Sequence, residues 1–427
     1  MASWICAQLG AREHYAVPRA LHRSGRLGGF YTDFWASDAW RRLAGQVAGP
    51  MRSLGQRFHG ELADACVRSW NVQSLGWDAS SRLRSRREGS AGRYKSYVQT
   101  GSCFACVLRD ELRRRDDLLP ETIFFAYDTG ALEALEWLRE RGIRSVLDQM
   151  DPSRVELELV REEERRWPGW QDGTVDVPEE YFQRREREWA LADRVMVNSE
   201  FSKRALIAQG VPPEKLVVVP LCYEGSSLEF KPTLQSDAEP LRVLWLGQVI
   251  LRKGIQYLLE AARQLVGEKI QFDVVGPIGI SSEAVASAPP NVTFQGRARR
   301  DQIDKWYRQA DVFVLPTISD GFALTQLEAM AHGVPVIATP NCGEVVSHEI
   351  DGLIVPARNA QVLAQAIFRY RVSPELLKDH RAAAPIKASQ FKLVQLAERL
   401  SCLETELDSS GQSQVRGGKH IHASNAE

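Results

Sequence analysis

The stretch DVFVLPTISDGFALTQLEAMAHGVPVIAT, residues 311–339, decides the fold of this chain. Apolar, β-branched runs at 312–316 and 335–339 predict two short strands, and 322–332 has the composition of a helix between them. Gly333 is a natural stop for that helix. A strand, a loop, a helix and a second strand make up the repeating unit of a parallel sheet with helices on its faces.

The rest of the second half repeats this unit. Further short apolar runs predict strands at 243–247, 272–276, 292–296 and 353–356. Between the first two, KGIQYLLEAARQL (253–265) carries apolar residues at helical spacing. Strands that alternate with helices predict a doubly wound α/β domain, whose ligands lie outside the carboxyl ends of its strands.

The first half repeats the theme less regularly. Its candidate strands are residues 3–8, 29–33, 122–128, 144–149, 194–199 and 216–221. The stretch 222–240 lacks periodicity and carries Gly, Ser and Pro, so it is predicted to be a linker. We therefore expect a Rossmann-like domain over 1–221, a second one over 241–405 and a polar, disordered tail over 406–427.

Two charged segments interrupt the first domain. Residues 82–95, RLRSRREGSAGRYK, are basic with glycines and serines, which predicts a mobile solvated loop. The alternative is a patch that contacts anionic lipid or an anionic acceptor. Residues 151–190 are rich in Glu, Arg and Trp and predict a charged helical excursion.

Composition sets limits on function. A length of 427 residues suits two domains of roughly 200 residues each. The net charge of -1 gives no electrostatic argument for nucleic acid. Seven thinly spread cysteines, with one C-x-x-C pair at 103–106, argue for a reducing cytosol and against a zinc site. Because no signal-peptide pattern or run of roughly 18 apolar residues is present, we expect a cytoplasmic protein.

The opening stretch also predicts a ligand site. The start of its helix leaves backbone N–H groups unpaired at the carboxyl end of a strand, where a phosphate binds readily, and Phe322, Ala323 and Leu324 would offer those groups. From farther along the helix, the Glu328 carboxylate could accept hydrogen bonds from the two hydroxyls of a ribose. Asp320, in the loop beside Gly321, would meet the other end of a diphosphate ligand.

A plainer interpretation stands beside this one. Asp320 could be a turn residue, and Glu328 an exposed helix residue. Glu328, however, lies among Leu324, Leu327 and the apolar run 329–331, which argues against simple exposure.

At these residues the sequence resembles a known family. DGFALTQLEAMAHGVPVIAT (320–339) looks like the E-x7-E signature of retaining glycosyltransferases of family 4, also called group 1. The resemblance implies the GT-B fold, two Rossmann-like domains that face each other across a cleft. Asp320 stands in the place of the first glutamate, which contacts hydroxyls of the transferred sugar. Glu328 matches the second, which binds the ribose of the nucleotide.

The resemblance extends to two further segments of the second half. In LGQVILRKGIQYLLEAA (246–262), a glycine turn at Gly247 precedes Lys253, which matches the lysine that neutralises the donor diphosphate. Gln248 stands where the family often has arginine, and Arg252 is a possible substitute for that cation. A solvated helix start is the alternative for Arg252 and Lys253. In the second segment, 292–317, Gly296 and Arg297 match the turn that faces the nucleobase, chiefly through backbone groups.

The acceptor side of the cleft is less well marked. Gly10, after the first strand, takes the place of the family's glycine loop, and Glu13 and His14 follow. His14 could equally be a packed residue at a helix start. The family frequently has a histidine after the fourth or fifth strand of this domain, where this chain has Asp148 and Asp151. Either aspartate could bind an acceptor hydroxyl.

The expected function is transfer of a sugar, with retention, from a UDP- or GDP-sugar donor to a carbohydrate or glycolipid acceptor. No cofactor and no metal are expected, because the helix start and Lys253 could take the place of a divalent ion. Family analogy places the reaction in cell-surface polysaccharide or glycoconjugate synthesis, with possible peripheral contact at the inner face of the membrane. The alternatives are an epimerase or hydrolase of nucleotide sugars on the same fold, and a sugar-nucleotide-binding protein without catalysis.

Overall fold

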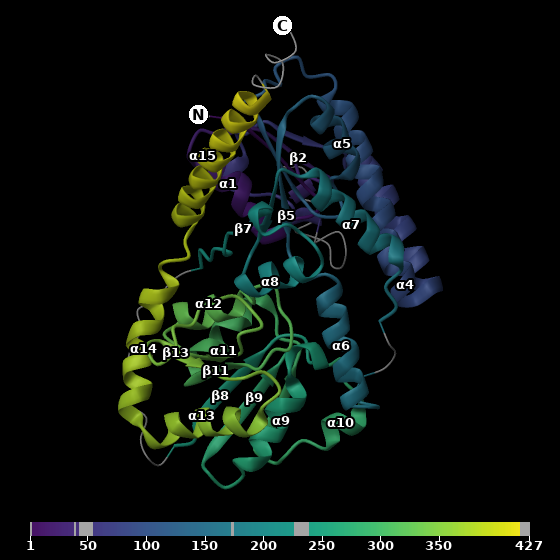
Figure 1. The fold of residues 1–427 in the computed structure, drawn as a ribbon. Coiled ribbons are helices and arrows are strands. Elements are labelled where there is room, and N and C mark those ends of the chain that lie inside the picture. Colours follow the sequence, from purple (N-terminus) through teal and green to yellow (C-terminus); the bar gives the residue numbers. More distant parts are fainter. Residues whose placement is uncertain (1, 38–39, 42–53, 172–174, 226–238, 419–427) are drawn as a thin grey trace, which may run out of the picture.

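The structure is a computed structural model that describes residues 2–37, 40–41, 54–171, 175–225 and 239–418. It contains two parallel sheets, one in each half of the chain, so the predicted pair of doubly wound domains is confirmed. Figure 1 shows the two lobes stacked on one another, with the first sheet in the upper lobe and the second in the lower.

The first sheet has seven strands in the order β3-β2-β1-β4-β5-β6-β7. Its strands are β1 (Trp4–Gln8), β2 (Leu27–Thr32), β3 (Val67–Ser69), β4 (Ile123–Tyr127), β5 (Arg144–Gln149), β6 (Arg194–Val197) and β7 (Leu216–Val218). Its helices are α1 (Ala16–Arg23), α4 (Asn71–Leu112), α5 (Leu132–Glu140), α6 (Arg154–Arg166), α7 (Glu179–Leu191) and α8 (Glu200–Ala208), with short 3₁₀ turns η1 (Arg12–Tyr15), η2 (Gly60–Leu62) and η3 (Pro213–Lys215).

The second sheet has six strands in the order β10-β9-β8-β11-β12-β13. Its strands are β8 (Leu241–Leu246), β9 (Ile270–Val275), β10 (Val292–Gly296), β11 (Val312–Leu315), β12 (Val336–Ala338) and β13 (Gly352–Ile354). The helices that follow are α9 (Ile255–Gln264), α10 (Ser282–Ala286), α11 (Ile303–Gln309), α12 (Thr325–Ala331), α13 (Ala360–Val372), α14 (Pro374–Ala388) and α15 (Leu393–Gly418), with the 3₁₀ turns η4 (Leu251–Lys253) and η5 (Arg300–Gln302).

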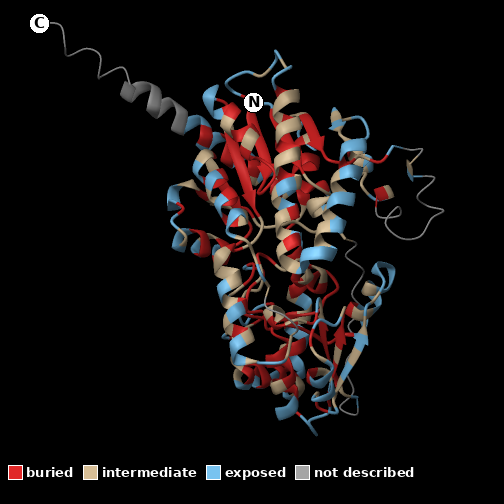
Figure 2. Cartoon of the chain, turned by 90° about the vertical axis from the view of Figure 1, so that its right-hand side faces the viewer, coloured by how far each residue is buried: buried red, intermediate tan, exposed pale blue. Residues whose placement is uncertain are grey.

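Both sheets are buried on their two faces. Along β1, Ile5 and Ala7 join a core built with α4, α5 and α7, whereas Trp4 and Cys6 join a core built with α1 and α15. Because each face of the strand meets apolar helices, its sequence WICAQ is buried throughout. Figure 2 shows the same pattern for the whole chain, with buried residues on the inner strands and exposed ones on the outer helices.

Two predictions about disorder are wrong. Residues 82–95 belong to the long helix α4, which changes direction at Gly89. Residues 406–418 belong to α15, which packs against α1 through leucines that include Leu403 and Leu407. The burial of these leucines explains why the segment is ordered. The chain therefore returns to the first domain before its end, which the predicted boundary at 405 did not anticipate (Figure 1). Most of the predicted linker, 226–238, and the last residues, 419–427, lie outside the described residues.

The charged excursion predicted over 151–190 is confirmed as α6 and α7, and α6 lies against the second domain. Its Glu163 is fully buried and accepts hydrogen bonds from Gln256 Nε2 and Tyr257 Oη, both at 2.9 Å. Arg358 completes the cluster, with its Nε 2.6 Å from Glu163 Oε1. This buried ionic contact fixes one side of the cleft between the domains.

Candidate functional site

The carboxyl ends of the two sheets meet at a cleft. A cavity of about 280 Å³ lies there, lined by Met150, Asn198 and Leu221 of the first domain and by residues of the second that follow β8 and β11. In the second sheet the strand order reverses between β8 and β11, at this cavity. Ligands of doubly wound folds bind at such switch points.

The loop after β11 forms one wall of this cavity. The Asp320 N–H donates to Asn341 O at 3.0 Å, and Ala323 has a left-handed backbone, with φ of 63°. Helix α12 begins only at Thr325, so the helix start predicted at Phe322 is three residues too early. Gly333 is left-handed and ends the helix as predicted. Phe322, Ala323, Leu324 and Thr325 all line the cavity.

Gly321 marks the point where this loop touches the first domain. A Cβ atom there would lie 2.2 Å from Met150 O and 2.9 Å from Asn198 Nδ2. Asn198 Nδ2 also donates to Met150 O at 2.8 Å, which holds that carbonyl in place. The next residue, Ser199, accepts the Ser202 N–H at 3.0 Å and caps α8.

Asp320, Lys253 and Arg252 lie together, as predicted. Lys253 Nζ donates to Asp320 Oδ2, and Arg252 Nη1 donates to Ser319 O at 2.9 Å. Burial raises the pKa of the Asp320 carboxyl, but Lys253, Arg252 and the Phe322 N–H outweigh it, so the pKa lies below its ordinary value. Asp320 is therefore a carboxylate at neutral pH, with a cation beside it that can turn toward a phosphate.

Glu328 lies in a second cavity of about 500 Å³, which also takes in His14, Arg300 and Tyr307. Tyr307 Oη donates to Glu328 Oε2 at 2.8 Å, and His332 stacks on the Tyr307 ring at 5.2 Å between centroids. Burial raises the pKa of Glu328, and the Tyr307 hydrogen bond opposes that rise. Glu328 is thus a half-buried acidic residue held by a tyrosine, not an exposed helix residue.

The two cavities adjoin, because Leu221 and Leu324 line both of them. Asp320 and Lys253 line one, and Glu328 lines the other. The two acidic residues thus lie in adjoining cavities, and their contact with one elongated ligand stays a prediction. Gly247 lines the first cavity, whereas Gly296 and Arg297 line neither, and Arg300 of η5 lines the second.

The loop after β1 faces the second cavity from the first domain. The Gly10 N–H donates to Asp33 Oδ1 at 2.8 Å. Glu13, His14 and Tyr15 have φ of 51°, 50° and 62°, a run of left-handed residues that costs free energy and is typical of functional loops. His14 Nε2 lies 2.6 Å from Arg300 Nη2 across the cleft, so His14 is not simply packed at a helix start.

The two candidate acceptor aspartates lie in different surroundings. Asp148 is almost fully buried, lines none of the cleft cavities described here and leaves Oδ2 without a hydrogen-bond partner. Burial and the carboxylates Glu13 and Asp128 raise its pKa. Asp151 is partly exposed and accepts from Arg185 Nη2 at 2.7 Å. Only Asp151 is therefore placed to contact an acceptor.

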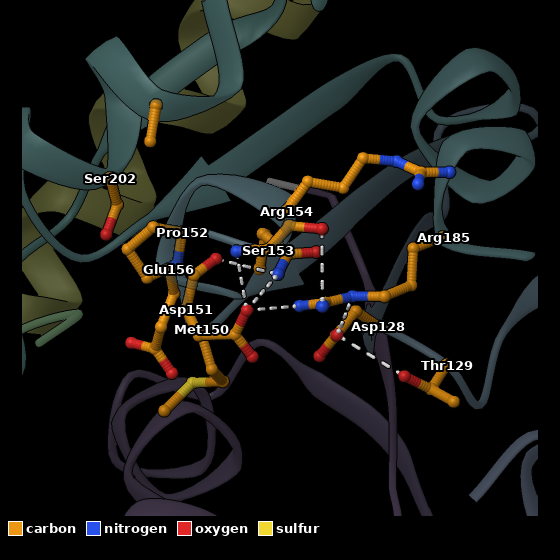
Figure 3. A network of polar contacts seen from close by, with 12 residues as sticks. Asp128, Thr129, Met150, Asp151, Pro152, Ser153, Arg154, Glu156, Arg185 and Ser202 are labelled. Carbon is orange, nitrogen blue, oxygen red and sulfur yellow. Dashed lines mark hydrogen bonds and ion pairs between the residues drawn. The ribbon is translucent and has the colours of Figure 1, made fainter. Parts of the chain in front are cut away.

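Figure 3 shows the network around Asp151, in which Arg185 reaches from α7 to both Asp151 and Asp128. Sequence reasoning missed Asp128 and Arg185. Asp128 is the last residue of the predicted strand 122–128 and directly follows β4, and that position at a strand end is a signal that could have found it. Arg185 lies among the alternating charges of α7, where nothing in the sequence separates it from solvated neighbours.

None of the helices in the described part of the chain is both long and apolar enough to cross a bilayer. Over the same residues, no three or more His, Cys, Asp or Glu side chains gather in a way that could hold a metal ion.

Residues 240–370 match the family model of glycosyl transferases group 1. The chain is 27% identical over 210 residues to the amylovoran biosynthesis glycosyltransferase AmsK of Erwinia amylovora, covering 45% of this chain and 51% of that protein. It is 28% identical over 229 residues to the D-inositol 3-phosphate glycosyltransferase of Streptomyces bingchenggensis, covering 47% of this chain and 50% of that protein. The chain spans about half the length of the curated relatives it matches.

Solved structures extend the likeness to almost the whole chain. The sucrose-phosphate synthase of Thermosynechococcus elongatus has a TM-score of 0.60 at 17% identity, covering 96% of this chain and 100% of that one. Anabaena HepE in complex with UDP has a TM-score of 0.58 at 16% identity, covering 95% and 100%. This likeness shows the GT-B fold. Together with the family match, it supports the resemblance seen in the sequence: residues 240–370 match the group 1 glycosyl transferase model, within a chain of GT-B fold.

Proposed function

We propose that this protein is a retaining glycosyltransferase that moves a sugar from a nucleotide-diphosphate donor to a carbohydrate or lipid-linked acceptor. The observation that carries the proposal is the pair of adjoining cavities with Asp320 and Lys253 at one end and Glu328 at the other. A nucleotide sugar has a matching order of groups: sugar, diphosphate and ribose.

Each end of the cleft has a role in this proposal. Asp320 accepts hydroxyls of the transferred sugar, and Lys253 leaves its ion pair with Asp320 to meet the diphosphate. The backbone of Phe322–Leu324 adds N–H groups at the diphosphate. Glu328, with Oε2 already held by Tyr307, offers Oε1 to the ribose.

The reaction needs no protein nucleophile. The acceptor oxygen bonds to the anomeric carbon on the face that the diphosphate leaves, and the bond from that carbon to the diphosphate oxygen breaks. The acceptor proton passes to the departing diphosphate. Configuration is retained because the new bond forms on the face that the leaving group vacates. The protein contributes positioning and charge stabilisation of the leaving group.

The comparisons support the substrate class and the setting. HepE is described in complex with UDP and with UDP-glucose, which favours a uridine diphosphate sugar over a guanosine one. AmsK belongs to amylovoran biosynthesis, and the putative WcaL glycosyltransferases belong to colanic acid biosynthesis. We therefore place the reaction in cell-surface polysaccharide or glycoconjugate synthesis.

A donor titration followed by a transfer assay tests the proposal. UDP or GDP should raise the melting temperature in proportion to binding, and a labelled donor should give a new glycoside only when an acceptor is present. Release of free sugar or an epimer without acceptor would instead favour a hydrolase or epimerase, and binding without turnover a non-catalytic protein.

A variant pair sharpens the test. Lys253→Ala should lower kcat by roughly 10²–10³-fold, because it removes the cation at the leaving diphosphate. Lys378→Ala is the matched control, since Lys378 is 60% exposed and its ion-pair partner among the described residues is the exposed Glu375. Equal turnover of the two variants would contradict the assigned role of Lys253.

A further inference from the structure

A third cavity is lined by Arg252 and by Glu156, which accepts a hydrogen bond from Ser319, the residue before Asp320. It has a volume of about 160 Å³, and we call it the tyrosine pocket. Its walls include Tyr94 of α4, Val160 of α6, Tyr181 of α7 and Ile250 just before η4. Asp151, Glu156, Arg185 and Arg252 line it as well. Arg252 precedes Lys253 in η4, so the pocket lies next to the proposed reaction centre.

On the basis of the proposed function, we propose that the tyrosine pocket binds one neutral pyranose ring of the acceptor and rejects an anionic one. Its volume is below the roughly 300–1,000 Å³ of pockets that hold drug-sized ligands, which suits a single ring. Because the second domain supplies Ile250 and Arg252, the pocket is complete only when the two domains are together.

The apolar part of the pocket fits the face of a sugar ring on which the C–H groups are exposed. Tyr94 and Tyr181 meet edge to face, with centroids 5.0 Å apart, and Phe182 continues the aromatic wall. Aromatic rings bury large apolar areas at little cost in side-chain entropy. Tyr97 touches the same cluster but does not line the pocket and is 47% exposed.

The polar end presents a hydrogen-bond acceptor for sugar hydroxyls. Ser153 N–H donates to Asp151 Oδ1 at 2.8 Å, and Arg185 Nη2 donates to the same oxygen at 2.7 Å. Within the described part of the chain, the hydrogen bonds to the Asp151 carboxylate end on Oδ1 and none ends on Oδ2. The Asp151 side chain is 38% exposed, so Oδ2 is free to accept a hydroxyl.

Both cations of the pocket already pair with carboxylates of the protein. Among the described residues, no cation is therefore left there to balance a charge on the ligand. Arg185 is fully buried between Asp151 and Asp128, with its Nε 2.8 Å from Asp128 Oδ2 (Figure 3). Arg252 pairs with Glu156 at 3.2 Å. A uronic acid would bring its carboxylate up to the Asp151 carboxylate without a free cation to balance it, and like charges at close range in a desolvated site repel strongly.

The test uses the full chain with UDP bound and a panel of methyl glycosides. Saturation-transfer NMR measures binding of methyl glucoside, galactoside and mannoside against the corresponding methyl uronides. We expect at least one neutral glycoside to bind at least 10-fold more tightly than its uronide. Equal binding of the two, or no neutral glycoside bound while UDP binds, would overturn the proposal.

Two variants locate the binding in the tyrosine pocket. Tyr94→Ala should weaken the neutral glycoside about 10-fold, whereas Tyr97→Ala, the control from the same aromatic cluster, should not. Asp151→Asn should lower the ratio of the affinity for the neutral glycoside to that for its uronide. The melting temperature of this variant shows whether its fold is intact. If Tyr94→Ala binds the glycoside like Tyr97→Ala, the pocket is not the site.

The UDP dissociation constant separates this inference from the function on which it rests. All these variants should bind UDP as the unaltered protein does, because the tyrosine pocket does not include Glu328 or the loop of Phe322–Leu324. If neither UDP nor GDP binds to the unaltered chain, the proposed function fails. If UDP binds and the glycoside results are negative, only the acceptor inference fails.

Discussion

Gly321→Ala should uncouple nucleotide binding from sugar transfer. Gly321 touches the first domain at the backbone carbonyl of Met150, where an added Cβ would lie only 2.2 Å away. That carbonyl cannot turn aside freely, because Asn198 Nδ2 holds it at 2.8 Å. The φ of Gly321 is not among the left-handed ones, so alanine meets a steric obstacle and not backbone strain.

The size of the effect follows from the geometry. The new contact would be about 1 Å shorter than ordinary van der Waals distance, so the two domains must separate by about that much at this point. A misplacement of about 1 Å between reacting groups costs roughly 10²-fold in rate. The proposed nucleotide contacts lie mainly in the second domain, so the UDP dissociation constant should change by less than about 3-fold.

Steady-state kinetics and isothermal titration measure the two quantities on the same preparation. Gly76→Ala is the control, because a Cβ at that exposed position of α4 meets nothing within 4 Å. Thermal unfolding of both variants shows whether the fold is intact. A Gly321→Ala protein with kcat within about 3-fold of the control would refute the argument that this contact sets the closed geometry.

Three further predictions concern the cleft. Glu328→Ala should cost about 2–4 kcal/mol in UDP binding or transition-state stabilisation, and Tyr307→Phe should cost less. The effect of Tyr307→Phe should vanish when 2′,3′-dideoxy-UDP, which lacks the ribose hydroxyls, replaces UDP. Titration of the protein with both nucleotides checks this. Burial raises the pKa of Glu13 to about 7 from 4.5, against the opposing effect of Arg12 and Tyr127, so its proton is lost at a higher pH in the folded than in the unfolded state. The resulting loss of folding free energy is absent below pH 4.5 and grows to about 3 kcal/mol by pH 7. Glu13→Gln should therefore become more stable relative to the unaltered protein over that window, which urea unfolding measures. A difference in unfolding free energy that does not change with pH would contradict this. Transfer should persist in a chelator such as EDTA, and an absolute requirement for manganese would disprove metal-independent catalysis.

Much of the fold could be predicted from the sequence, because buried parallel strands leave a local signal. Each of the twelve apolar runs chosen as a strand overlaps a strand of the structure; β3 (Val67–Ser69), short and only half-buried, was missed. Segments 82–95 and 406–418 were misjudged, because their polar composition resembles that of a loop or tail. Helix α15 is ordered by leucines that contact α1, at the other end of the chain.

For the candidate site too, the sequence predicted some features and not others. Asp320, Lys253 and Glu328 could be found because short segments place them at fixed offsets from strand ends. The surroundings that decide their protonation come from other parts of the chain. Tyr307 reaches Glu328 from 21 residues away, and Arg300 meets His14 from 286 residues away.

The sequence by itself determined the two α/β domains and the acidic residues of the donor side, since periodicity and turn chemistry act over a few residues. Only the tertiary structure decided which groups share the cleft. It placed Asp128 and Arg185 beside Asp151, buried Asp148 away from the cavities and put Gly321 against Met150. The physical reason is that burial, ion pairing and steric contact depend on distance in space, and the partners of each group are brought near by folding from distant parts of the chain.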